Sequence, residues 1–78
     1  MKELAMKQVS MYAECVVKLC KDDPENTSFY KTYYDGKVDG VIDMLSTDSE
    51  LSSREYVELS QKLKAYFKVV TERALQFK

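Results

Sequence analysis

Apolar side chains near the start of the sequence recur every three or four residues, the spacing that places them on one face of an α-helix. This pattern holds over residues 2–21, where we expect the first helix. Its predicted core-facing stripe consists of Ala5, Val9, Tyr12, Val16 and Leu19, with Ala13 and Cys20 widening it.

A second helix is expected over residues 28–45, where the same spacing returns. Its apolar positions are Tyr30, Tyr34, Val38, Val41, Met44 and Leu45, flanked by Phe29, Tyr33 and Ile42. Gly36 and Gly40 both lie inside this helix, and an interior glycine costs about 1 kcal/mol of helix stability relative to alanine. By intrinsic propensity, this is therefore the least stable of the helices.

The connection before the second helix contains the single proline of the chain, Pro24. It cannot continue the first helix, because proline lacks a backbone N–H donor. Proline is favoured in the first turn of a helix, so one alternative places Pro24 at the start of the second helix with Asp23 as its cap. Thr27 and Ser28 are competing caps, and the sequence leaves the choice open.

The third helix, expected over residues 53–77, has the most distinct start. Ser52 and Glu55 form a Ser-x-x-Glu capping box, and Leu51 and Tyr56 occupy the two positions of a hydrophobic staple. A seven-residue repeat then places Tyr56, Leu59, Leu63, Tyr66, Val70 and Phe77 on one stripe, interrupted by Arg73 and flanked by Ser60, Phe67 and Ala74. Such a repeat predicts long, nearly aligned helix packing.

These elements predict an all-α fold, a single domain over residues 1–78 in which three helices run up, down and up through two short polar connections. A chain this short buries only roughly 60% of its unfolded surface, so association is a natural source of added stability. Val57, Val69 and Leu75 fall outside the main stripe of the third helix. We therefore expect a homodimer that buries them.

Charge is segregated along the chain, although the net charge is only −1. Residues 22–50 sum to −6, whereas residues 1–21 sum to +2 and residues 51–78 to +3. Five acids of the middle segment precede predicted helices, where the helix dipole favours negative charge. These are Asp22, Asp23, Glu25, Asp48 and Glu50.

The other three acids, Asp35, Asp39 and Asp43, recur every four residues and form one negative stripe along the second helix. Two interpretations remain open: a solvated face partly neutralised by lysines of neighbouring helices, or a surface that docks a basic partner, including a site that normally holds nucleic acid. Gly36 and Gly40 allow another helix to approach closely, inside the fold, at a dimer seam or in a partner, unless they are simply tolerated in this helix.

The aromatic cluster at the start of the second helix is too broad to be buried by one narrow seam, so part of it is expected at an interface. It consists of Phe29, Tyr30, Tyr33 and Tyr34. Taken with the acids and glycines, it defines one candidate surface. The predicted partner-binding residues are Tyr33, Asp35, Gly36, Asp39, Gly40 and Asp43.

Features of enzymes are scarce. The sequence contains no histidine, the usual general base, and the glycines of residues 36–40 match neither nucleotide-binding fingerprint. Cys15 and Cys20 diverge too far on one helix for a strain-free disulfide, which favours reduced thiols in a reducing cytosol. We therefore expect no catalytic activity, no metal and no cofactor.

The hydropathy of the chain favours a cytoplasmic location. No apolar run exceeds three residues, which is too short to span a membrane, and the first residues hold no continuous hydrophobic stretch of the kind found in secretory signals. Direct nucleic-acid binding is disfavoured, because the basic residues of the third helix do not converge on one face. These are Arg54, Lys62, Lys64, Lys68 and Arg73.

The segment over residues 33–45 reads Tyr-Tyr-Asp-Gly-Lys-Val-Asp-Gly-Val-Ile-Asp-Met-Leu. It resembles a segment of small helical proteins of phages and prophages, in which an aromatic residue and Gly-Lys-x-Asp-small lead into an apolar helix. In this chain Gly40 stands where alanine is more usual. The resemblance carries no active residues with it, but it implies a protein that binds and inhibits a host protein complex.

We therefore expect a protein–protein interaction module, encoded by a phage, that inhibits or regulates a host complex in the host cytoplasm through the acidic, tyrosine-containing face of its second helix. The first alternative is a structural or assembly protein whose third helix forms an oligomer seam. The second alternative is a small DNA-binding regulator, which would bind duplex with a steep dependence on salt.

Overall fold

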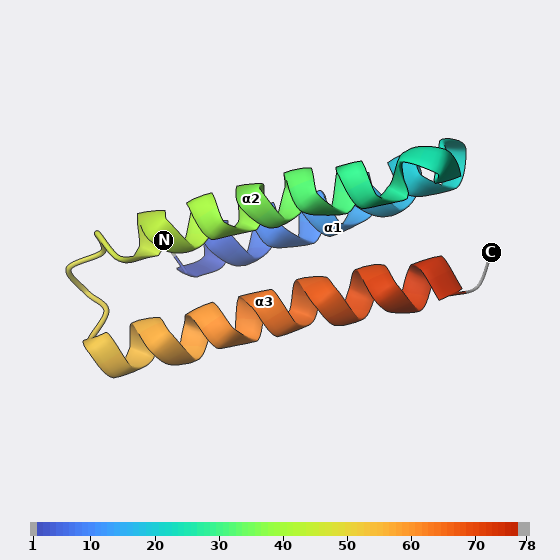
Figure 1. Cartoon of the computed structure of the whole chain (residues 1–78). Helices are drawn as coiled ribbons and strands as arrows, with labels where there is room; N and C mark the ends of the chain where they lie inside the picture. Colours follow the sequence, from blue (N-terminus) through green and yellow to red (C-terminus); the bar gives the residue numbers. More distant parts are fainter. Residues whose placement is uncertain (1, 77–78) are drawn as a thin grey trace.

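A computed structural model describes residues 2–76 of the chain, and Figure 1 shows three long helices packed along a common direction. Helix α1 spans Lys2–Asp22, α2 spans Thr27–Leu45 and α3 spans Ser53–Gln76, and a short 3₁₀ helix, η1, spans Pro24–Asn26. The described residues contain no strand. The three predicted helices are confirmed, and Phe77, the predicted last residue of the third, lies outside the described residues.

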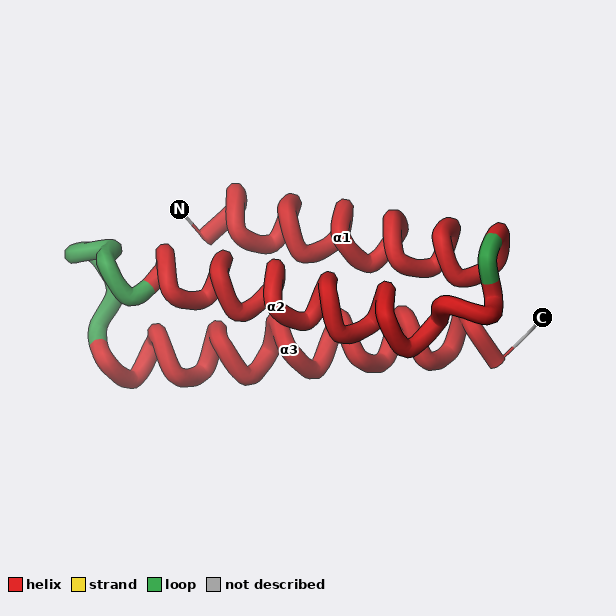
Figure 2. The backbone as a smooth tube through the Cα atoms, turned by 45° about the horizontal axis from the view of Figure 1, so that its top comes forward, coloured by secondary structure: helices red, strands yellow, loops and turns green. Residues whose placement is uncertain are grey.

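The helices alternate in direction. In Figure 1, α2 runs back along α1, and α3 runs in the same direction as α1. Figure 2 shows the same three tubes with the two connections at opposite ends. The molecule is correspondingly elongated, with extents of 41 × 18 × 16 Å. The N-termini of α1 and α3 therefore lie at the same end.

Asp23 and Pro24 shape the first connection. Pro24 begins η1 rather than α2, and Asp23 precedes it at the N-cap position. The Asp23 carboxylate accepts hydrogen bonds from Asn26 Nδ2 at 2.8 Å and from the Tyr30 hydroxyl at 2.9 Å. These bonds lower the pKa of Asp23, and the second raises the pKa of Tyr30. Thr27 is the first residue of α2 and not its cap, and its hydroxyl donates to the Pro24 carbonyl oxygen at 2.7 Å.

The capping box predicted before α3 is confirmed. The Glu55 backbone N–H donates to Ser52 Oγ at 3.2 Å, and the Ser52 backbone N–H donates to Glu55 Oε1 at 3.4 Å. Glu55 also pairs with Lys2 Nζ at 3.3 Å, and hydrogen bonds from Lys2 and Ser52 lower the pKa of Glu55. Leu51 and Tyr56, the predicted staple, both pack against the core. These contacts hold the start of α3 beside the start of α1.

The core lies where α1 meets the other two helices. Its buried residues are Ala5, Val9, Ala13, Val16 and Cys20 from α1, Val38, Val41, Ile42 and Leu45 from α2, and Leu63, Phe67 and Thr71 from α3. Ala13 and Cys20, predicted at the margin of the stripe, are fully buried, whereas Tyr12 and Leu19 are half-buried. Met44, predicted to face the core, is exposed instead.

The predicted seven-residue stripe of α3 is wrong at its centre only, since Tyr56, Leu59, Leu63 and Val70 are buried or pack against the core as expected. Tyr66, predicted on the stripe, is 45% exposed, whereas Phe67, predicted at its flank, is only 4% exposed. Buried residues instead recur every four positions, at Leu63, Phe67 and Thr71. The reason is that α3 packs against α2 as well as α1, and Phe67 lies on the side of α3 that meets Val38 of α2. The buried Thr71 hydroxyl donates to the Phe67 carbonyl oxygen at 2.8 Å.

The three residues that suggest a homodimer do not form one seam. Leu75 packs against the core, whereas Val57 and Val69 are exposed. The separation between the two valines turns them about 120° apart around the helix axis. No single flat partner surface on α3 therefore covers both, and the homodimer stays a prediction.

Candidate functional site

All six predicted partner-binding residues lie on α2 and are exposed. They are Tyr33, Asp35, Gly36, Asp39, Gly40 and Asp43. At about 100° per residue they cover about 160° of the helix circumference, with the acids on the side of α3 and Tyr33 on the other side. The exposed Phe29 lies within the same arc, and the exposed Met44 borders it about 20° beyond Tyr33. We call these eight residues the α2 face.

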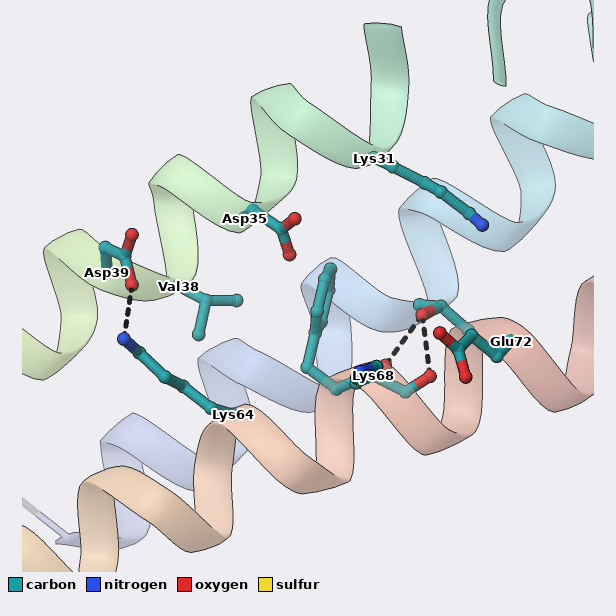
Figure 3. Close-up of a pocket in the computed structure, with 9 residues that line it drawn as sticks. Lys31, Asp35, Val38, Asp39, Lys64, Lys68 and Glu72 are labelled. Carbon is teal, nitrogen blue, oxygen red and sulfur yellow. Dashed lines mark hydrogen bonds and ion pairs between the residues drawn. The ribbon is translucent and has the colours of Figure 1, made fainter. Parts of the chain in front are cut away.

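The acidic edge of the α2 face borders a groove of about 440 Å³ between α2 and α3. Val38 and Phe67 form its apolar floor. Figure 3 shows Asp35 directed from α2 toward α3, and Asp39 joined to Lys64, with 3.3 Å between Oδ1 and Nζ. Both members of this pair are mostly exposed, so the ion pair contributes only about 0–1 kcal/mol to stability.

Lysines surround the acids at this edge. Lys31 of α2 and Lys64 and Lys68 of α3 line the groove, together with Glu72. Partial neutralisation by neighbouring lysines, one of the two interpretations of the acidic stripe, therefore applies to its α3 side. Among the described residues no ion pair involves Asp43, so this end of the stripe keeps its charge exposed to solvent.

The opposite edge of the α2 face is aromatic. Phe29 and Tyr33 are 65% and 50% exposed, and their rings stack with centroids 6.3 Å apart. Lys37 Nζ lies 5.2 Å from the Tyr33 ring centroid, and interaction with the Tyr33 side chain raises the pKa of Lys37. Tyr30 and Tyr34 instead pack against the core. The aromatic cluster is therefore divided, with two rings buried in part and two presented to solvent.

Gly36 and Gly40 lie in the middle of the α2 face. Apart from the local helix backbone, no heavy atom of the described chain lies within 4 Å of a Cβ built at either position. Tight packing inside the fold, one of the predicted uses of these glycines, is therefore wrong, and alanine would fit at both positions. The uncovered backbone instead leaves space for close approach by another molecule.

Met44 is a member of the α2 face that the sequence pattern assigned to the core. It is 47% exposed. The separation of eleven residues between Tyr33 and Met44 is about three helical turns, so the same spacing that defines the face already places Met44 in line with Tyr33. That relation is the signal by which it is recognisable in the sequence.

Within residues 2–76, no three Cys, Asp or Glu side chains gather closely enough to hold a metal ion. None of the helices there combines the length and the apolar character needed to cross a membrane.

Comparison with known proteins identifies no relative of this chain. A scan against protein-family models, a search of curated proteins and a search of solved structures each found no match. Function is therefore inferred from the chemistry and geometry of the α2 face.

Proposed function

We propose that this chain is a protein-binding module that contacts its partner through the α2 face. The observation that supports this most strongly is the exposure of all six predicted residues on one side of one helix. Stacked aromatic rings, uncovered glycine backbone and carboxylates lie next to one another there. Exposed aromatic side chains surrounded by polar groups are typical of the energetic centres of protein interfaces.

A partner with a basic surface fits this face best. Asp35, Asp39 and Asp43 form a negative edge about two turns long, and charge complementarity of this kind raises association rates and selects partners. A protein surface that normally holds nucleic acid has the matching charge. The resemblance of residues 33–45 to phage segments supports one form of this function, a phage-encoded inhibitor or regulator of a host protein complex that acts in the cytoplasm.

Reversing the charge of the acidic edge tests this proposal. The variant Asp39→Lys with Asp43→Lys is expected to lose its partner in affinity capture from the source cell. Its helicity, and its melting temperature at low protein concentration, should remain nearly unchanged, because both side chains are exposed and only the Asp39–Lys64 ion pair is lost.

A matched control is Glu3→Lys with Glu14→Lys, which makes the same charge change at exposed positions of α1. This control should capture the partner as the unmodified chain does. Undiminished capture by the α2 variant, or equal loss by the control, would show that the α2 face is not the contact surface.

A further inference from the structure

On the side of the bundle away from α2, helices α1 and α3 form an apolar groove of about 640 Å³. Leu59 and Leu63 lie at its base, and the exposed side chains of Met6 and Tyr66 form its walls. The Tyr66 hydroxyl donates to Ser10 Oγ at 3.4 Å, which links the two walls. A groove between two aligned helices is the shape into which another helix packs.

Two lysines determine which occupant suits this groove. Lys7 lines it from α1 and Lys62 from α3. Both are exposed, and neither forms an ion pair with another described residue. If two identical grooves packed against each other about a two-fold axis, four lysine side chains would meet at one interface. Because like charges at an interface oppose binding, the groove favours an acidic occupant over a copy of itself.

The α2 face of the chain has the matching properties. It presents the apolar side chains of Phe29, Tyr33 and Met44 beside the carboxylates of the acidic edge. The uncovered backbone at Gly36 and Gly40 lets this face enter a groove without obstruction from side chains. We propose that the α2 face of one copy docks into the α1/α3 groove of the next, so that the chain associates with itself head to tail.

Head-to-tail docking sets the kind of assembly. The two surfaces lie on opposite sides of the bundle, so a pair of molecules leaves one α2 face and one groove free. Further copies add to these free surfaces, and the assembly grows without closing. This inference rests on the contact surface proposed for α2, and it makes the chain itself a ligand of that surface that competes with the external partner.

Sedimentation of the full chain between micromolar and millimolar concentrations tests the inference. The average mass of the unmodified chain should rise continuously with concentration and fall in molar salt, because salt screens the ion pairs. The groove variant Lys7→Glu with Lys62→Glu, and the face variant Asp39→Lys with Asp43→Lys, should each weaken self-association by at least about tenfold. Mixing the two variants should restore association, because each supplies the surface that the other lacks.

The matched control is Lys18→Glu with Lys21→Glu, which makes the same charge change as the groove variant at exposed positions of α1 outside the groove. It should associate like the unmodified chain. Circular dichroism checks that every variant remains helical, and Met6→Glu, at an exposed position of the groove, provides a second groove variant that should also weaken self-association.

Three results would overturn the inference. They are an unmodified chain that stays monomeric throughout, a closed dimer whose mass does not grow with concentration, and a mixture of the two variants that stays monomeric. The groove variant also separates this inference from the proposed function, because its α2 face is intact. If the groove variant captures the partner normally and the unmodified chain shows no self-association at any concentration, the partner-binding proposal stands and the head-to-tail inference fails.

Discussion

At the scale of single residues, Gly36 and Gly40 weaken the helix that carries the candidate site. Each costs about 1 kcal/mol relative to alanine in a helix interior, and the described fold makes no use of the space that they leave open. Residues that break a local rule without a compensating contact are expected at functional surfaces. The cost of the glycines to the helix and the open space beside them thus indicate the same candidate surface as the exposed aromatic rings do.

Replacing these glycines is expected to stabilise the isolated chain. Gly36→Ala and Gly40→Ala should each raise the free energy of unfolding by about 0.5–1 kcal/mol, and together they should raise the melting temperature by several degrees. Urea unfolding followed by circular dichroism measures the change. The reverse substitution Ala65→Gly, at an exposed position of α3, should lower stability by a similar amount. Destabilisation by the alanines would reveal a close contact at these positions.

At the scale of helices, local signals and packing control different properties. The start of α3 follows from the Ser52–Glu55 capping box, which forms as expected. The buried side of the same helix is wider than its seven-residue stripe, because α3 packs against α2 as well as α1. The result is a change of one position at the centre of the core, from Tyr66 to Phe67.

Alanine substitutions at these two neighbouring positions test the register. Phe67→Ala should reduce the free energy of unfolding by about 3–5 kcal/mol, since it leaves a cavity in the core. Tyr66→Ala should cost about 1 kcal/mol or less, because nearly half of its side chain is in solvent. Both are measured at low protein concentration, so that self-association does not contribute. If Phe67→Ala does not fold, Phe67→Leu provides the milder comparison, and a larger loss at Tyr66 would support the seven-residue stripe.

At the scale of the whole molecule, the fold places Lys64 and Lys68 of α3 beside the acids of α2 and leaves another pair of lysines on the opposite side. The acidic residues 35–43 occupy one side of α2, and Lys7 and Lys62, distant in sequence, meet at the groove on the other side of the bundle. In the structure, α1 contributes five buried residues to the core and also forms one wall of this groove. The net charge of −1 hides this polarity, which is the basis of head-to-tail docking.

Thermal stability should therefore depend on protein concentration. Association that requires the folded state raises the melting temperature by mass action, so the unmodified chain should melt at a higher temperature as its concentration increases. The groove variant Lys7→Glu with Lys62→Glu should show a much smaller rise over the same range of concentrations. Differential scanning calorimetry measures both, with Lys18→Glu and Lys21→Glu together as the control. A concentration-independent melting temperature for the unmodified chain would contradict self-association.

The candidate site was more predictable from the sequence than the core. Residues four apart on a helix share a face wherever that helix packs, so Asp35, Asp39 and Asp43 follow from counting alone. Counting does not show which side of that face adjoins α3. The Asp39–Lys64 ion pair joins two different helices, so it could be recognised only in the folded structure.

The sequence by itself determined the three long helices of residues 2–76, their approximate positions and which residues share a face, but it left the start of the second helix open. Capping, proline geometry and helical periodicity act over a few residues and need no knowledge of the rest of the chain. Only the tertiary structure decided which faces are covered, placing Phe67 inside and Tyr66 and Met44 outside. The physical reason is that burial depends on where the neighbouring helices lie. The hydrophobic effect is non-directional, so the sequence of one helix does not specify which of its apolar side chains will be covered.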